Sequence, residues 1–336
     1  MKFLIAGAGA IGAYIGARMS QAGFDVTLFA RGPHLRAMQG RGVQVKSAEG
    51  DFVARPTIAG SLAEVGPMNV IFLGVKAHGL PQLAPQLEPV LGPDTTVVST
   101  QNGIPWWYFE GFGGQWEGLH LDRVDPGGVI SSAIEARRVV GSIVYFSTEV
   151  IAPGVIQHIE GNRISLGEPG GARSDRSRRI AEALIASGFR CPVTTRLRHE
   201  IWVKALGNAS FNPVSALTRA TLAQMTRDPG VCSVIRNIML EVEAVSRKLG
   251  MELPVSIDQR IAGAEKVGEH KTSMLQDLEA GRPMELEALV GAIVELGERV
   301  GLPMTCTRTV YNCTSLLAQG NSSATKVNAP LDVAPR

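Results

Sequence analysis

A glycine-rich turn near the N-terminus constrains the fold of this chain more than any other part of its sequence. Residues 7–12 read Gly-Ala-Gly-Ala-Ile-Gly and match the pattern G-x-G-x-x-G. The turn follows an apolar run, Lys2 to Ala6, and leads into a helical pattern, Ile11 to Ala22. A second apolar run, Asp25 to Ala30, comes next. A strand, a glycine-rich turn, a helix and a second strand at these distances predict a nucleotide-binding parallel sheet of the Rossmann type.

The three glycines have separate uses in such a turn. Gly7 permits the tight bend, Gly9 lets backbone N–H groups approach a pyrophosphate, and Gly12 lets the helix pack closely against the strand. The diphosphate of a dinucleotide would then lie at the helix N-terminus, beside Ala10 and Ile11. A glycine-rich turn of purely structural use is the alternative.

The end of the second strand favours NADPH over NADH as the cofactor. Enzymes that use NAD typically place Asp or Glu here to bond the ribose 2′-hydroxyl, whereas this chain has Arg31. A guanidinium suits the added charge of a 2′-phosphate. The alternative is that Arg31 is a solvated turn residue.

Two later strands also end in polar residues. The segments Asn69 to Val75 and Thr95 to Thr100 are followed by Lys76 and by Asn102. Ligands bind at the carboxyl edge of an open α/β sheet, so we expect both side chains to contact the cofactor or the substrate. Ordinary transitions from strand to loop would place the same residues there.

The rest of the pattern predicts two domains and a tail. Strand-like segments extend the sheet over residues 141–149, 155–158 and 163–166, and a helix then runs to about Ser187. Helices follow over residues 197–217, 229–249, 256–267, 284–300 and 304–318. We predict an NADP-binding domain over 1–195, a helical substrate and catalytic domain over 196–318, and a disordered tail over 319–336.

Composition narrows the classes of function. A chain of 336 residues with 45% hydrophobic residues and a net charge of +2 suits a two-domain globular protein. It has no basic run, so we expect no nucleic-acid partner. Its four cysteines lack the spacing of a metal site, and no apolar stretch is long enough to span a membrane. The apolar N-terminus is interrupted early by glycines, so we expect no signal peptide and a cytoplasmic protein.

The segment around residue 204 suggests the chemistry. On a helix, Lys204, Asn208 and Asn212 recur at positions i, i+4 and i+8 and share one face among apolar neighbours. Hydride transfer to a ketone leaves negative charge on the carbonyl oxygen, which a buried ammonium can stabilise and protonate. A snorkelling lysine beside capping asparagines is the alternative, with Asn212 ending the helix before Pro213.

Two further polar residues follow. Glu285 opens a predicted helix, where a carboxylate is favourable in any case. Ser273 begins the motif Ser-Met-Leu-Gln-Asp and could be only a helix cap.

Together these motifs resemble the ketopantoate reductase family over nearly the whole chain up to about Leu317. The resemblance rests on GAGAIG at 7–12, VKAH at 75–78, QNG at 101–103, WVKALGNASFNP at 202–213, and SMLQD at 273–277 followed by Glu285. It implies a doubly wound Rossmann sheet followed by an all-α C-terminal domain like that of 6-phosphogluconate dehydrogenase. It also implies NADPH-dependent reduction of 2-dehydropantoate to (R)-pantoate, a step towards pantothenate.

The same resemblance implies roles for the site residues. Lys204 is the catalytic acid, Asn102 holds the reacting carbonyl beside the nicotinamide, and Lys76 lies on the cofactor side. Glu285 bonds a substrate hydroxyl and is the second catalytic residue. The substrate is faced by Asn208 and Asn212, and its carboxylate is bound by Ser273.

Two features leave the substrate open. The family's further asparagine, expected shortly after the Asn-Pro pair, is missing from residues 214–221. An aromatic segment from Ile104 to Gly128 contains three of the four tryptophans and is either a packing loop or a lid that reshapes the pocket. A different 2-oxo acid, a bulkier ketone, or a noncatalytic NADPH-binding regulator are the alternatives. A helical domain of this size often supports a homodimer.

Overall fold

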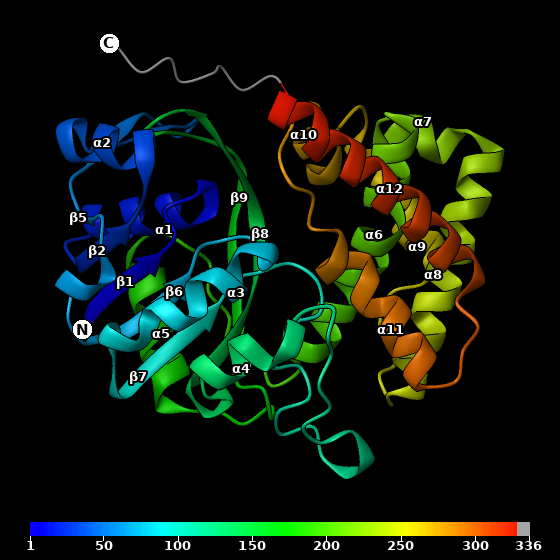
Figure 1. Ribbon diagram of the computed structural model, residues 1–336, viewed down its shortest axis with the longest axis horizontal. Coiled ribbons are helices and arrows are strands. Elements are labelled where there is room, and N and C mark those ends of the chain that lie inside the picture. The colour runs from blue at the N-terminus through cyan, green and yellow to red at the C-terminus, as the bar shows by residue number, and fades with distance from the viewer. Residues whose placement is uncertain (328–336) are drawn as a thin grey trace. The chain divides into compact units, whose positions relative to one another are not determined.

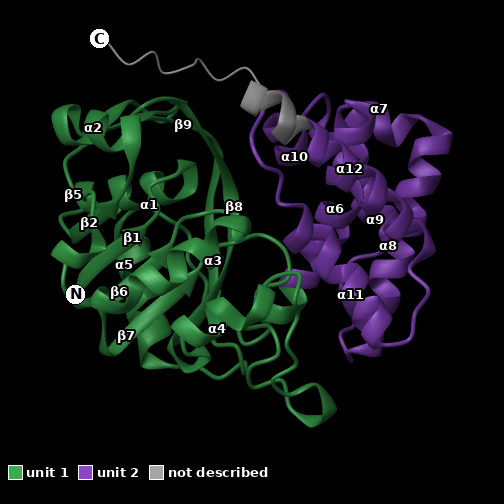
Figure 2. Cartoon of the chain, viewed as in Figure 1, with its two compact units in different colours: residues 1–200 green, residues 201–336 purple. Residues whose placement is uncertain are grey.

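The computed structural model describes residues 1–327 of the chain. The chain divides into two compact units, one of residues 1–200 and one of residues 201–336 (Figure 2). The last helix, α12 (Thr305–Val327), continues past the predicted end at Ala318, and no proline interrupts the sequence within it. The end of the predicted tail, residues 328–336, lies outside the described residues.

Within residues 1–200, all of which are described, nine strands form one sheet in the order β4-β3-β9-β8-β7-β6-β1-β2-β5. The strands are β1 Lys2–Ala6, β2 Asp25–Phe29, β3 Val43–Lys46, β4 Phe52–Ala54, β5 Thr57–Ala59, β6 Met68–Leu73, β7 Leu91–Ser99, β8 Val139–Ala152 and β9 Val155–Gly167. The run from β5 to β8 is parallel, and β8 and β9 form a long antiparallel hairpin (Figure 1). The helices of this unit are α1 Ala10–Gln21, α2 Gly32–Arg41, α3 Leu80–Leu83, α4 Val129–Ala133 and α5 Asp175–Ala186.

The register of the central strands brings their carboxyl ends to one edge of the sheet. Ala6 at the end of β1 is opposite Phe29 of β2 and Leu73 of β6, and Leu73 is in turn opposite Ser99 of β7. The loops that leave these four strands therefore start side by side. This edge carries the predicted cofactor residues.

Close packing of α1 on the strands depends on two glycines. A Cβ atom on Gly12 would lie 2.9 Å from Cγ2 of Ile5, and one on Gly16 would lie 3.0 Å from Cγ1 of Ile5. Ile5 and Leu28 are fully buried beneath this helix. The missing side chains let the helix axis approach the sheet, as predicted for Gly12.

Several elements of this unit differ from the sequence prediction. The segment from Val155 to Gly167 is one continuous strand, because its pairing with β8 passes through the predicted gap. Helix α2 and strands β3 to β5 were not predicted. The strands are only three or four residues long, too short to show a periodic pattern.

The second unit consists of helices. They are α6 Leu197–Thr218, whose first turn belongs to the first unit, α7 Leu222–Arg227, α8 Pro229–Lys248, α9 Ile257–Val267, α10 Ser273–Glu279, a π-helical turn Glu287–Gly291, α11 Ala292–Arg299 and α12. Thr221 and Ser256 begin α7 and α9 with capping boxes. The largely parallel sheet followed by helices confirms the predicted fold class. None of the helices in the described part of the chain combines the length and apolar character that a bilayer crossing needs.

Candidate active site

The glycine-rich turn has the geometry of a nucleotide-binding loop. Gly7 adopts φ +107°, which other residues rarely adopt, and a Cβ atom there would approach Val75 N to 3.0 Å. Gly9 differs, because its φ is −69° and a Cβ atom would make only an ordinary contact, 3.5 Å from the carbonyl oxygen of Gly74. Backbone conformation and packing therefore require glycine at position 7 and tolerate a side chain at position 9.

The N-terminus of α1 has no protein cap. Gly9 is the N-cap residue and offers no side chain, and the first turn contains no acidic residue. The first N–H groups of a helix, here those that begin with Ala10 and Ile11, have no partner within the helix. This end of α1 therefore presents donors and a positive dipole to an anion.

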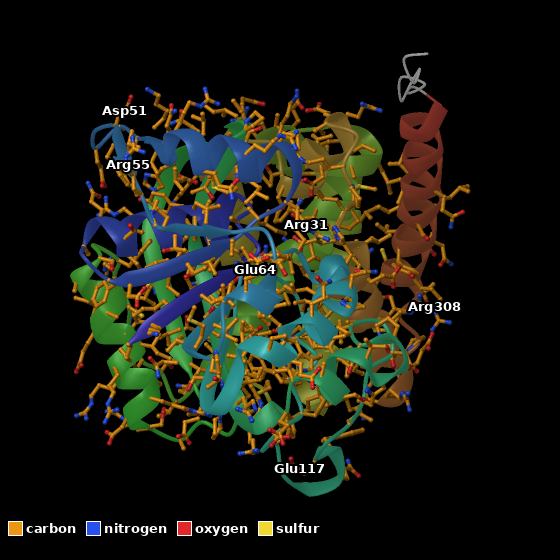
Figure 3. The ribbon with its side chains drawn as sticks, turned by 60° about the vertical axis from the view of Figure 1, so that its left-hand side comes forward. Arg31, Asp51, Arg55, Glu64, Glu117 and Arg308 are labelled. Carbon is orange, nitrogen blue, oxygen red and sulfur yellow. The ribbon has the colours of Figure 1, made fainter. Side chains whose placement is uncertain are left out.

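Arg31 is exposed where β2 meets α2 (Figure 3). It is the N-cap residue of α2, and Gly32 after it adopts φ +57°. Residues 31–41 include no Asp or Glu that could compete for its guanidinium. A phosphate at this position would meet an accessible positive charge.

Sequence reasoning missed Gln101, which joins two loops at the same edge. Its side-chain amide donates hydrogen bonds to the carbonyl oxygens of Leu73 (2.7 Å) and Val75 (2.8 Å). The loop after β7 carries half-buried Asn102, and the loop after β6 carries exposed Lys76. Gln101 therefore fixes the relative positions of the two backbone segments that carry these predicted site residues. The motif Gln-Asn-Gly was the available signal.

In the second unit, α6 carries Lys204, Asn208 and Asn212 on one face. Asn212 is 7% exposed, and the other two side chains are half-buried. The helix does not end at Asn212, as one alternative held, but continues through Pro213 to Thr218. Proline removes one helical hydrogen bond and perturbs the helix without ending it here.

Lys204 has the electrostatic setting of a proton donor. Burial lowers the pKa of its amine from an ordinary 10.5 to about 8. The carboxylate of Glu285 opposes this change, and the guanidinium of Arg260 adds to it. All three groups belong to the second unit, so the charge cluster is a property of that unit.

Glu285 lies two residues before an irregular turn of helix. It is 9% exposed, and the π-helical turn Glu287–Gly291 follows it. Glu287 is held by Tyr311 of α12, whose hydroxyl donates to its carboxylate at 2.8 Å. The two carboxylates therefore interact with different groups: Glu287 accepts a hydrogen bond from Tyr311, whereas the charge of Glu285 raises the pKa of Lys204. Single π-helical turns occur frequently at functional sites.

Ser273 is not the cap of α10. The N-cap is Thr272, whose hydroxyl accepts a hydrogen bond from the N–H of Leu275 at 3.3 Å. Ser273 is the first helical residue and is exposed. Its side chain is therefore available to a ligand.

Comparison with known proteins identifies the family. Residues 3–106 match the family model described as ketopantoate reductase PanE/ApbA, and residues 196–318 match the model for its C-terminal part. The chain belongs to the ketopantoate reductase family. The resemblance recognised in the sequence is therefore confirmed.

Two related proteins match this chain over almost their full length. A 2-dehydropantoate 2-reductase from Mesorhizobium japonicum is 49% identical over 90% of this chain and 93% of its own. A 2-dehydropantoate 2-reductase from Archaeoglobus fulgidus is 30% identical over 92% of this chain and 95% of its own. A crystal structure of a candidate ketopantoate reductase from Ralstonia solanacearum has 36% identity and a TM-score of 0.91, and the match covers 95% of this chain and 98% of that chain.

The aromatic segment lies mostly in residues 107–195, outside both family matches. Trp107, Tyr108 and Phe109 are at most 3% exposed, and the Trp107 ring covers Gly141 of β8. Arg198 donates to the carbonyl oxygens of Tyr108 (3.1 Å) and Glu110 (2.6 Å). These three side chains belong to the core of the first unit, as the packing-loop alternative predicted.

The remaining part of the segment is a surface loop. Glu117 lies on a projecting loop and accepts hydrogen bonds from the N–H groups of Gly111 (2.8 Å) and Gly113 (2.5 Å) (Figure 3). These bonds, that of Gly113 first, lower the pKa of the Glu117 carboxyl below its usual value. The carboxylate of Glu117 therefore links the end of this loop to its beginning.

Proposed function

We propose that this protein reduces 2-dehydropantoate (ketopantoate) to (R)-pantoate with NADPH, a step towards pantothenate. Membership of the ketopantoate reductase family and the names of its relatives support the reaction. The observation that carries the proposal is the amine of Lys204, whose pKa of about 8 and position beside Glu285 suit a proton donor at neutral pH. We also expect a cytoplasmic enzyme, because its four cysteines are free thiols.

The residues of the first unit fit a dinucleotide phosphate. Nothing in the packing around Gly9 calls for glycine, so close approach of a ligand is the remaining physical reason for its missing side chain. The uncapped N-terminus of α1, with Ala10 and Ile11, would hold the diphosphate, and Arg31 would hold the 2′-phosphate. When bound, NADPH supplies the hydride. Lys76 would contact it from the neighbouring loop.

Lys204 has two tasks in this proposal. Its ammonium donates a hydrogen bond to the substrate carbonyl and stabilises the negative charge that grows on the oxygen. It then passes a proton to that oxygen, which becomes the product hydroxyl. A pKa near 8 keeps most of the amine protonated at pH 7 and makes transfer easier than from an ordinary lysine.

Other polar residues orient the substrate. We assign Asn208 and Asn212 to the substrate because they share the face of α6 that carries Lys204. Glu285 would accept a hydrogen bond from a substrate hydroxyl and support the charge of Lys204. Asn102 would hold the carbonyl, and Ser273 would donate to the carboxylate.

A bulkier 2-oxo acid is the second candidate substrate. Trp106 follows Asn102 by four residues and is only half-buried, unlike its neighbour Trp107. Its indole N–H is buried and has no hydrogen-bond partner among the described residues. An indole face near Asn102 would favour an aromatic or branched substituent on the keto acid.

Steady-state assays on a panel of 2-oxo acids test the proposal. The NADPH-loaded protein is mixed with ketopantoate and with branched and aromatic 2-oxo acids, and loss of the reduced nicotinamide absorbance is followed. The highest kcat/KM should belong to ketopantoate. Failure on ketopantoate with turnover of a bulkier acid would select the second candidate. Tight NADPH binding without turnover of any member would select the noncatalytic regulator.

A further inference from the structure

Gly207 is an unexpected residue in the middle of α6. It is buried three residues after Lys204, within a helix of 22 residues. Glycine in a helix interior costs about 1 kcal/mol relative to alanine. A buried position that keeps glycine therefore needs a packing or functional reason.

The reason is the side chain of Arg260. A Cβ atom on Gly207 would lie 3.2 Å from Cζ and 3.3 Å from Nε of this arginine, and closer still to Nη2. Any larger residue at position 207 would displace the guanidinium. The absent side chain lets the planar group lie directly against the backbone of α6.

Arg260 is held in place by the start of α9. Ser256 caps that helix in a capping box with Gln259, and the N–H of Arg260 donates to the carbonyl oxygen of Ser256 at 3.0 Å. The side chain of Arg260 is half-buried. A short, capped helix thus delivers a guanidinium to one defined place on α6.

That place is next to the proposed proton donor. Positions 204 and 207 are three residues apart, which places them on neighbouring points of one helix face, roughly 5–6 Å apart. The charge of Arg260 acts on Lys204 and helps to lower the pKa of its amine. Lys204, Arg260 and Glu285 together carry two positive charges and one negative, and this positive sum favours an anionic substrate.

We propose that Arg260, seated on Gly207, binds the carboxylate of the 2-oxo acid. In such an acid the carboxylate adjoins the carbonyl that Lys204 protonates, so a guanidinium seated on Gly207, about one turn along α6 from Lys204, suits the group beside that carbonyl. A guanidinium can bind a carboxylate through two parallel hydrogen bonds. Arg260 supplies the positive charge that the hydroxyl of Ser273 lacks. It would also add a substrate contact in a chain whose residues 214–221 lack the asparagine expected there. This inference rests on the proposed function.

Substitution of Arg260 tests the subsite through substrate charge. Arg260→Gln removes the charge and shortens the side chain but keeps a polar amide, and Arg260→Lys keeps the charge without the paired hydrogen bonds. For Arg260→Gln the KM for ketopantoate should rise about 10- to 100-fold. The change for ketopantoate methyl ester, which has no carboxylate, should be at least ten times smaller. Arg260→Lys should fall between wild type and Arg260→Gln for the acid.

Arg236→Gln is the matched control. Arg236 of α8 has a side chain that is 42% exposed, and it pairs with Asp258 of α9 at 2.6 Å. Asp258 comes two residues before Arg260, but neither Arg236 nor Asp258 is part of the proposed subsite. Loss of Arg236 should leave both KM values within about twofold, as expected for an exposed ion pair. Gly207→Ala, which pushes the guanidinium away with a single methyl group, should reproduce the acid-selective loss of Arg260→Gln.

Binding separates this inference from the proposed function. Calorimetric titration of ketopantoate into the NADP⁺-loaded protein should show 10- to 100-fold weaker binding in Arg260→Gln than in wild type. Equal losses for acid and ester, or no loss for either, would overturn the subsite. If the wild type reduces no 2-oxo acid but binds the acid through Arg260, the proposed function fails and the subsite stands.

Discussion

Gln101 donates its side-chain amide hydrogen to the carbonyl oxygen of Val75 at 2.8 Å and thereby ties the loop after β7 to the loop after β6. One residue further along each loop lie Asn102 and Lys76. Asn102 and Lys76 are proposed to act on substrate and cofactor. Gln101, to which we assign no contact with either ligand, therefore positions both residues through the backbone.

Gln101→Leu should loosen both loops. The substitution removes the donor to the carbonyl oxygen of Val75 and one of the donors to that of Leu73, which still accepts from the hydroxyl of Thr100, and this should lower the free energy of unfolding by about 1–3 kcal/mol. The KM for NADPH should rise together with a fall in kcat. Chemical denaturation and steady-state kinetics measure both. Gln86→Leu is the control, because the exposed Gln86 side chain donates only to the nearby carbonyl of Gln82; equal effects of both variants would refute the positioning role.

Lys204→Ala should abolish most turnover while NADPH binding persists. Loss of a positioned general acid lowers kcat by about 10²- to 10⁴-fold. Rapid kinetics and fluorescence titration of NADPH measure the two properties. Lys248→Ala, at an exposed site on α8, should behave as wild type. Unchanged turnover in Lys204→Ala would remove this residue from the mechanism.

The rate of reduction should depend on the protonation of Lys204. The pKa of its amine is lowered to about 8, and the donor must be protonated. The rate should therefore be highest below pH 8 and fall as the pH rises through that value. Glu285 raises this pKa, so Glu285→Gln should move the fall to lower pH, whereas Arg260→Gln should move it to higher pH. The dependence of kcat on pH, measured for the wild type and for both variants, gives the pH at which the rate falls in each protein. Shifts opposite to those expected would contradict the proposed effects of Glu285 and Arg260 on the pKa of Lys204.

Arg31→Gln should weaken the preference for NADPH. A charged hydrogen bond to phosphate contributes about 1.5–3 kcal/mol, so the KM for NADPH should rise roughly 10- to 100-fold while that for NADH changes little. Arg36→Gln tests another exposed cation of α2 and should leave the preference intact. A wild-type enzyme that prefers NADH would refute the assignment of Arg31.

Trp107→Ala should destabilise the first unit. The side chain is 3% exposed and packs on Gly141, and loss of such an aromatic group costs about 3–5 kcal/mol. Thermal unfolding measures the effect. Trp116→Ala, in the half-buried surface part of the segment, should cost much less. Wild-type stability in Trp107→Ala with altered turnover would instead support a lid.

The sequence by itself determined the parts of the protein that depend on local patterns. The order strand, Gly7 to Gly12, helix, strand predicted the fold class, because close helix-to-strand packing and a tight bend leave few residues other than glycine. The spacing of Lys204, Asn208 and Asn212 likewise placed them on one face, since helical geometry alone decides that. Short strands such as β5 and the capped turn at Thr272 carried too little pattern to be predicted correctly.

Only the tertiary structure decided which residues from distant segments meet. The contacts of Gln101 with Val75 and of Arg260 with Gly207 join residues 26 and 53 positions apart, and no local period predicts such pairs. The lowered pKa of Lys204 depends on its burial and on the charges of Glu285 and Arg260, which the fold alone brings near. Local sequence set the elements and the candidate donor, and long-range packing set the environment that makes its chemistry possible.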